Sequence, residues 1–274
     1  MRFASLGSGS EGNALLVETT DGTARVRVLV DCGFGRREAE RRLRSLGCEP
    51  DSLSAIVVTH EHSDHIGGVF RLAAAHRIPV CLTHGTLIGC GRIGPAGGGP
   101  AGGGFAGGGP AEDLVRLITP DQVFEVDGLQ IEPVPVPHDA REPVQYVFDN
   151  GRARLGVLTD LGHGTPHVVR ALARLDALVL ECNHDPDLLA GNPGYPPALK
   201  RRIGGRWGHL ANAEAARILA AIDRSRLRTV VAAHLSQQNN RPELAQQALA
   251  TVLQSDLEAV RVADQTTGLD WHPV

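Results

Sequence analysis

The sequence predicts an α/β (α+β) fold, a four-layer αββα sandwich in which two mixed sheets pack face to face with helices outside. Two observations predict it. The first half of the 274-residue chain is rich in short strands joined by turn signals, and the last third alternates helix with strand. Apart from a glycine-rich stretch at 89–110, nothing reads as a linker, so we expect a single domain over residues 1–274.

The first strands are expected at 3–6, 13–19 and 25–30. They form a meander, with a hairpin signal at Asp21-Gly22. Residues 7–12 (GSGSEG) satisfy the G-x-G-x-x-G pattern of dinucleotide sites, but such a site needs a helix after the glycines, and a strand follows. A tight hairpin is the better interpretation. Ser8, Ser10 and Asn13 are candidate substrate contacts at a rim, and turn chemistry alone explains them equally well.

The remaining elements follow from hydrophobic periodicity. A helix at 36–46 presents Ala39, Leu43 and Leu46 on one face. Further helices are expected from 66 to about 75 and at 165–175, 211–222 and 242–254, and strands at 53–59, 79–83, 114–119, 122–126, 129–136, 145–148, 154–159, 177–181, 228–233 and 257–262. Asn240 is the expected cap of the last helix. Residues 89–110 are predicted to form a flexible surface insertion, because glycine-rich sequence offers few side chains to offset the entropy lost on ordering.

Residues 59–65 (THEHSDH) place three histidines and one aspartate directly after the apolar strand at 53–59. Imidazole nitrogens and a carboxylate are ligands for divalent transition metal ions, and a loop after a strand can aim them into a cleft. A merely solvated polar loop is the alternative interpretation, which this placement disfavours.

The same position, just beyond a predicted strand, recurs for Asp31, His138, Asp160 and His234. If those strand ends share one sheet edge, these polar groups meet the 60–65 cluster in a single cleft. Taken alone, Asp160 would be interpreted as an acidic turn residue. Each histidine would be interpreted as a surface or core residue whose hydrogen bonds are satisfied within the protein.

The order of the motifs VDCG, THEHSDH, a lone histidine, TDLG and AHLS resembles the metallo-β-lactamase superfamily over essentially the whole chain. The details SGSEGN, VPHDAREPVQYVF, ECNHD, GHLAN and HLSQQNN are similar to its YycJ (or WalJ) branch, which is related to ribonuclease Z and associated with DNA exonuclease activity. The resemblance implies an αββα sandwich with a binuclear site along one sheet edge.

The resemblance also implies the ligands of two metal ions: His60, His62 and His138 on the first, Asp64, His65 and His234 on the second, and Asp160 bridging them. Donors of this kind without cysteine suit two divalent ions, Zn²⁺ first, with Mn²⁺ or Fe²⁺ as alternatives. A hydroxide between the ions is the expected nucleophile. Asp64 is therefore expected to be catalytic as well as a ligand, and Asp31 to act by orienting a ligand imidazole.

Two further histidines are candidate site residues. His184, with Asn183 and Asp185 beside it, is expected to donate a proton to a leaving oxygen, and this polar group is also a candidate clamp for a phosphate. His209 and Asn212, in the sequence GHLAN, are expected to contact substrate together with Asn183. A structural role is the alternative for each, and Asn212 would then simply begin the next helix.

Composition limits the classes of partner. The net charge of −4 and the pI near 6.3 disfavour, without excluding, a nucleic-acid binder that relies on overall basicity. No apolar run approaches the roughly 20 residues of a membrane-spanning helix, and no signal-type apolar core follows Met1, so we expect a cytoplasmic protein with no membrane partner. The five cysteines contain no C-x-x-C pair, which argues against a disulfide framework or a zinc ribbon.

These expectations combine into a dinuclear metal-dependent hydrolase that cleaves phosphodiester bonds, a DNA exonuclease or related nuclease, with DNA preferred to RNA and a small phosphodiester as an alternative substrate. The expected contacts for a phosphate backbone are Lys200, Arg201, Arg202 and Arg206. The same ligands would also serve a cyclic phosphodiesterase, a thioesterase or a lactonase. Alternatives from another class are a non-catalytic metal- or ligand-binding module and a di-iron redox protein, the latter disfavoured because no flavin or rubredoxin-like segment accompanies the domain.

Overall fold

The computed structural model describes residues 1–20, 25–91 and 112–274. The hairpin expected at Asp21-Gly22 lies outside the described residues, and so does the glycine-rich insertion expected at 89–110, apart from its first three residues. Gly89 is the last residue of helix α4 (His84–Gly89), and a turn follows it.

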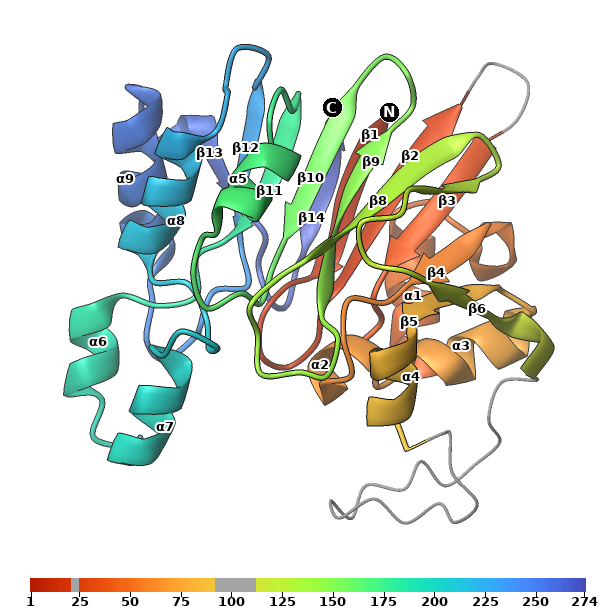
Figure 1. The fold of residues 1–274 in the computed structure, drawn as a ribbon, viewed down its shortest axis with the longest axis horizontal. Helices are drawn as coiled ribbons and strands as arrows, with labels where there is room; N and C mark the ends of the chain where they lie inside the picture. The colour runs from red at the N-terminus through yellow and green to blue at the C-terminus, as the bar shows by residue number, and fades with distance from the viewer. Residues whose placement is uncertain (21–24, 92–111) are drawn as a thin grey trace.

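Two mixed sheets, each of seven strands within the described residues, form the centre of the molecule (Figure 1). The first sheet runs in the order β14 (Leu269–Pro273), β1 (Arg2–Gly7), β2 (Ala14–Thr20), β3 (Arg25–Val30), β4 (Ala55–Val57), β5 (Val80–Thr83) and β6 (Val115–Ile118). The second runs in the order β13 (Val260–Val262), β12 (Thr229–Ala233), β11 (Ala177–Glu181), β10 (Arg154–Leu158), β9 (Val144–Asp149), β8 (Leu129–Pro135) and β7 (Phe124–Val126).

The directions of the strands determine where the chemistry gathers. β1, β2 and β3 form the predicted antiparallel meander, whereas β3, β4, β5 and β6 run parallel to one another. In the second sheet β10, β11, β12 and β13 are also parallel. Because the carboxyl ends of parallel strands lie at one edge of a sheet, the segments that follow β3, β4, β10, β11 and β12 can meet there.

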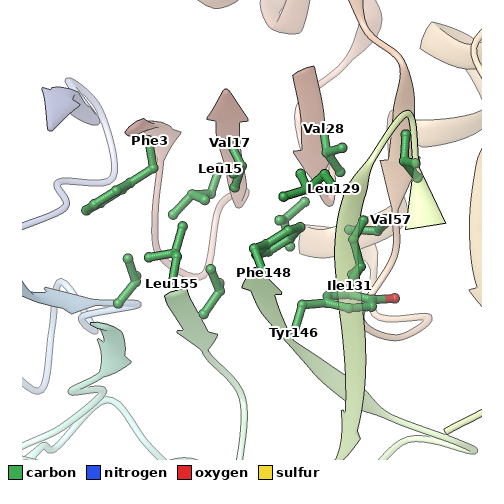
Figure 2. Packing of buried hydrophobic residues seen from close by; sticks show 14 of the residues in the cluster. Phe3, Leu15, Val17, Val28, Val57, Leu129, Ile131, Tyr146, Phe148 and Leu155 are labelled. Atoms are coloured by element: carbon green, nitrogen blue, oxygen red, sulfur yellow. The ribbon is translucent and has the colours of Figure 1, made fainter. Parts of the chain in front are cut away.

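The facing sides of the two sheets bury a shared hydrophobic core (Figure 2). Phe3 and Val17 come from the first sheet, and Tyr146 and Phe148 from the second; all four are fully buried. Burial of one such side chain contributes about 1.5–3 kcal/mol relative to its exposure. The Tyr146 hydroxyl also donates a hydrogen bond to the carbonyl oxygen of Val58 at 2.6 Å, which connects β9 to the end of β4.

Helices cover the outer faces of both sheets (Figure 1). On the first sheet these are α1 (Arg36–Ser45), α2 (Ser63–Ile66), α3 (Val69–His76) and α4, and on the second α5 (Pro166–Ala171), α8 (Asn212–Ala221) and α9 (Pro242–Leu253). Leu43 of α1 and Leu72 of α3 are buried in one outer cluster, and Leu219 of α8 and Leu249 of α9 in the other. The layers are therefore those of the predicted αββα sandwich. α6 (Pro186–Gly191) and α7 (Pro197–Ile203) lie beyond the strand ends, at the lower left of Figure 1.

Several elements differ from the sequence predictions. Residues Leu257–Ala259 form a 3-10 turn, so that only β13 remains of the strand expected at 257–262. Asn240 does not cap α9, because Arg241 occupies the cap position and the Asn240 side chain donates to the carbonyl oxygen of Cys182. β14, α4, α6 and α7 were not predicted. These three helices have six or seven residues, too few for a clear helical period, and β14 is defined by its pairing with β1.

Across the described residues, no helix combines the length and the apolar character needed to span a membrane. The cytoplasmic location stays a prediction. Four of the five cysteines are buried, and Cys90 is the partly exposed one.

Candidate metal centre

Three of the predicted site residues adopt a left-handed backbone conformation just after a strand. Asp31 (φ 58°) follows β3, Asp160 (φ 55°) lies two residues after β10, and His234 (φ 55°) follows β12. Residues other than glycine adopt this conformation at a cost of roughly 1–3 kcal/mol, and such residues recur at functional sites. All three side chains are buried, so the sharp turns direct polar groups inward at the strand ends.

His60, His62 and His138 form the first cluster. His60 Nε2 lies 3.0 Å from His62 Nδ1, which in turn lies 3.2 Å from His138 Nε2. The far side of two rings is held in place: His60 Nδ1 lies 2.9 Å from the Thr59 hydroxyl, and His138 Nδ1 donates to the carbonyl oxygen of Gly208 at 2.9 Å. These contacts leave three nitrogen lone pairs converging on one point.

Asp64, His65 and His234 form the second cluster. Asp64 Oδ2 lies 3.5 Å from His65 Nε2 and 3.6 Å from His234 Nε2. Asp160 adjoins both rings, with Oδ2 3.0 Å from His65 Nε2 and Oδ1 3.3 Å from His234 Nδ1. The same Oδ1 lies 4.0 Å from His138 Nε2, so the Asp160 carboxylate faces both clusters.

The donor atoms fit divalent metal ions. Within each cluster the ligand atoms lie within 4.8 Å of one another. His234 Nε2 is buried and has no hydrogen-bond partner among the described residues, which is unusual for a buried polar atom and is explained if its partner is a cation. Imidazole and carboxylate donors without cysteine suit divalent ions of intermediate hardness.

The two clusters differ in charge. Burial lowers the pKa of His60 well below its usual value and also lowers that of His138, and neighbouring imidazoles reinforce both effects, so these rings are neutral donors. In the second cluster burial acts in the same direction, but the surrounding carboxylates, Asp160 first, outweigh it. They raise the pKa of His65 well above its usual value and that of His234 to about 10. This second cluster is therefore a site where buried carboxylates favour positive charge.

Asp31 lies behind the second cluster, apart from the open cleft. Its Oδ2 lies 2.8 Å from His65 Nδ1 and accepts a hydrogen bond from the Thr59 hydroxyl at 2.7 Å. Its Oδ1 accepts from the Thr59 backbone N–H at 2.8 Å. Asp31 thus fixes the orientation of the His65 ring, as a carboxylate behind a ligand histidine does.

An open cleft runs over both clusters, lined by Ser10, His62, Ser63, Asp64, Asp139, Asp160, Leu199, Arg202, Ile203, Gly208, His209 and His234. His209 Nδ1 lies 2.8 Å from Glu181 Oε1. Although burial opposes the shift, the Glu181 carboxylate raises the pKa of His209. The sequence prediction did not include Glu181. Glu181 is nevertheless the last residue of β11, and the predicted site residues likewise lie at strand ends.

Asp139 is a second site residue absent from the expected set. Its Oδ1 lies 3.5 Å from His138 Nε2 and 3.7 Å from His62 Nε2. Its Oδ2 accepts a hydrogen bond from Arg202 Nε at 2.6 Å. Although burial opposes the shift, Arg202 lowers the pKa of Asp139. Asp139 therefore connects α7 to the first cluster. Its position directly after His138 in the sequence could have indicated that it belongs to the site.

Ser8 and Asn13 lie beneath the second cluster instead of lining the cleft. The Ser8 hydroxyl accepts a hydrogen bond from the backbone N–H of His234 at 2.8 Å. Asn13 Nδ2 lies 3.2 Å from His65 Nε2 and donates to the carbonyl oxygen of Gly9 at 2.9 Å. Of the three expected rim contacts, Ser10 alone lines the cleft.

The structure does not bring His184, Asn183 or Asn212 to the cleft. His184 is 3% exposed and forms an isolated bridge with Ala211. Asn183 Nδ2 donates to the carbonyl oxygen of His234 at 3.0 Å, and the Asn212 side chain, at the start of α8, pairs with another buried asparagine. The chain after β11 pairs with the segment before α8, and this pairing turns all three side chains into the interior.

Comparisons with known proteins agree with this architecture. A family model described as "Beta-lactamase superfamily domain" matches residues 26–235. The chain is 32% identical over 262 residues to the exodeoxyribonuclease YycJ of Bacillus anthracis, covering 93% of this chain and 89% of that protein. It is 28% identical over 264 residues to the exodeoxyribonuclease WalJ of Streptococcus pneumoniae, covering 93% and 90%. Among solved structures, the metallo-β-lactamase fold protein YhfI from Bacillus subtilis has a TM-score of 0.69 at 16% identity, covering 99% of both chains.

Proposed function

The chain belongs to the beta-lactamase superfamily, and from this premise we propose that it is a metal-dependent hydrolase that cleaves phosphodiester bonds in DNA, acting from an end. One observation carries the proposal: two clusters of ligand atoms, with the Asp160 carboxylate facing both, lie at the base of one open cleft. The exonuclease assignment draws support from the relative that is 32% identical over most of both chains and is named an exodeoxyribonuclease.

Two divalent ions would be held by seven residues: His60, His62 and His138 on one, Asp64, His65 and His234 on the other, and Asp160 shared. When bound, such ions supply Lewis acidity toward a phosphate oxygen and lower the pKa of water in the site. We assign Zn²⁺ as the first choice because imidazole nitrogen predominates among the donors, with Mn²⁺ and Fe²⁺ as the alternatives.

His209 is placed to donate a proton to the departing oxygen. It lines the cleft, and Glu181 engages its Nδ1 at 2.8 Å, which leaves Nε2 to carry the transferable proton. The raised pKa of His209 favours the protonated ring. As the bond between phosphorus and the leaving oxygen breaks, the proton passes from Nε2 to that oxygen. His209 thereby takes the role that the sequence suggested for His184, and Glu181 positions its ring.

A nucleic-acid substrate is supported by the charge of α7 and the turn that follows it. Residues 196–208 contain no acidic residue and four basic ones: Lys200, Arg201, Arg202 and Arg206. Arg202 lines the cleft, so positive charge continues from the metal clusters along α7, in a chain whose net charge is −4. Basic side chains arranged in this way contact the phosphates of a strand. DNA is preferred to RNA because the two relatives that align with 93% of this chain and are described above are named exodeoxyribonucleases.

The proposal is tested by metal analysis of the purified protein and by a screen with three substrates: bis-p-nitrophenyl phosphate, a thioester and end-labelled DNA. We expect two divalent ions per chain and turnover of the phosphodiesters. Turnover of the thioester with neither phosphodiester cleaved would assign the site to the thioesterase or lactonase alternative. Bound ions with no turnover of any substrate would favour a binding module.

A further inference from the structure

Trp207 is the most exposed of the large apolar side chains in the described part of the chain, at 62%. It lies in the turn between α7 and α8, one residue before Gly208 and two before His209. Since consecutive Cα atoms are about 3.8 Å apart, the Trp207 backbone is within about 8 Å of His209. Gly208 and His209 line the cleft, so the exposed side chain of Trp207 is carried by a turn that borders it.

The backbone at Trp207 is fixed against the loop that carries Asp160. A Cβ atom at Gly162 would lie 2.1 Å from the Arg206 carbonyl oxygen and 2.6 Å from the Trp207 nitrogen, so the two segments are in direct contact. On the other side, the Gly208 carbonyl oxygen accepts the hydrogen bond from His138 Nδ1. The turn that presents Trp207 thus contacts both the loop after Asp160 and His138, whereas the Trp207 side chain remains open to solvent.

Two of the arginines that precede Trp207 are available to an anion. Arg202 pairs with Asp139, and Lys200 donates to the carbonyl oxygen of Ala190. Arg201 and Arg206, in contrast, are exposed and form no ion pair with any carboxylate in the described residues, and the Arg206 guanidinium lies 3.4 Å from an exposed histidine nitrogen. An exposed aromatic side chain in the same segment as guanidinium groups that are not neutralised by carboxylates is a combination that binds single-stranded nucleic acid.

We propose that Trp207 is a stacking platform for a base of a single-stranded DNA end, with Arg201 and Arg206 contacting the phosphates of the same strand. This inference rests on the proposed nuclease function and specifies its substrate. A base stacks on the indole while the adjoining phosphate lies over the metal clusters beside His209. Because every base has an aromatic face, such a platform tolerates any sequence.

The first experiment measures KM for a single-stranded oligodeoxynucleotide and for an abasic oligomer of the same length and phosphate number. Stacking of one base is worth about 1–3 kcal/mol, so we expect the wild-type protein to favour the oligomer with bases about 5- to 150-fold. In Trp207→Ala this ratio falls to near one, and in Trp207→Phe much of it remains. Trp271→Phe, which changes the chain's other tryptophan, on β14, keeps the wild-type ratio. A Trp207→Ala protein that keeps two ions per chain and the wild-type ratio would overturn the proposal.

The second experiment does not depend on cleavage. In Trp271→Phe the remaining tryptophan is Trp207, whose fluorescence we expect a phosphorothioate oligodeoxynucleotide to quench and an abasic phosphorothioate oligomer to leave nearly constant, with the protein loaded with metal. Equal effects of both oligomers would refute stacking. Base-dependent quenching without cleavage of either natural oligomer would sustain the stacking site and refute the nuclease function. Cleavage without base-dependent quenching would support the nuclease function and refute the stacking site.

Discussion

Asp31 Oδ2 lies 2.8 Å from His65 Nδ1, and neither side chain is more than 4% exposed. The contact determines which nitrogen of His65 faces the cleft: Nδ1 is engaged behind the ring, and Nε2 lies in front of it, 3.0 Å from Asp160 Oδ2. A carboxylate in this position fixes the tautomer of the imidazole and increases its basicity as a ligand.

Replacement of Asp31 should therefore weaken one of the two metal sites. For Asp31→Ala we expect the affinity for the more weakly held ion to fall about 10- to 100-fold, because the His65 ring loses its orientation. Competition with a chromophoric chelator measures this affinity. Affinities equal to those of the wild-type protein for both ions would remove the positioning role of Asp31.

His60→Ala should abolish hydrolysis while the circular dichroism spectrum stays that of the folded protein. The substitution removes one of three converging nitrogens, so we also expect the bound metal to fall below two ions per chain. His76→Ala is the matched control. His76 is the last residue of α3, its Nε2 lies 2.9 Å from Oε1 of Glu40, and it does not line the cleft. A His60→Ala protein with an undiminished rate would mean that the site is wrongly assigned.

His209 and His184 should respond differently to the same change. His209→Ala removes the proposed proton donor, so we expect kcat on DNA to fall about 10²- to 10⁴-fold with the metal content retained. His184→Ala leaves the cleft lining intact and should change kcat far less, although a buried side chain is lost. Kinetics of the two variants at equal metal loading test the assignment of His209 as the proton donor. A larger loss of kcat in His184→Ala than in His209→Ala would assign that role to His184 instead.

Glu18 is expected to contribute stability that depends on pH. Its carboxylate is 7% exposed and lies 2.6 Å from Arg2 Nε and 2.8 Å from Arg27 Nε. Burial raises the pKa of Glu18, but the two guanidinium groups outweigh it and hold the pKa below its usual value. A depressed pKa means that this stability is present above the pKa of the unfolded chain and is lost as the pH falls through the folded value.

Glu18→Gln should lower the free energy of unfolding by roughly 1.5–3 kcal/mol at pH 7, and the difference from wild type should shrink below about pH 4. Urea denaturation at several pH values measures it. Glu49→Gln serves as the control: Glu49 pairs with Arg44 at the surface, 66% exposed, and its loss should cost less than about 1 kcal/mol. A Glu18→Gln difference that stays constant down to pH 3 would contradict the linkage.

The fold and the convergence of the ligand residues could be predicted because both depend on local patterns. Strand periodicity located most elements, and polar residues just beyond strand ends identified Asp31, Asp160 and His234, which the structure brings together. Glu181 shows the limit of that rule. It is the last residue within β11, and its carboxylate is directed to His209 by a pairing between the chain after β11 and the chain before α8.

The same pairing explains why His184 and His209 could not be ranked from sequence. Both lie in short polar segments with an asparagine nearby, so local chemistry does not distinguish them. The bridge to Ala211 buries His184, whereas His209 emerges into the cleft after the α7 turn. β14 posed a related problem, because its partner β1 lies at the other end of the chain and no local signal reports that contact.

The most direct test of the central claim is the release of label from end-labelled DNA by the purified protein with added Zn²⁺ or Mn²⁺, beside an Asp64→Ala control. Asp64 lies between the rings of His65 and His234, so its loss should disable one cluster without removing the cleft. We predict metal-dependent release of labelled nucleotide by the wild-type protein and none by Asp64→Ala. Intact DNA after incubation with protein that carries both ions, or equal release by Asp64→Ala, would contradict it.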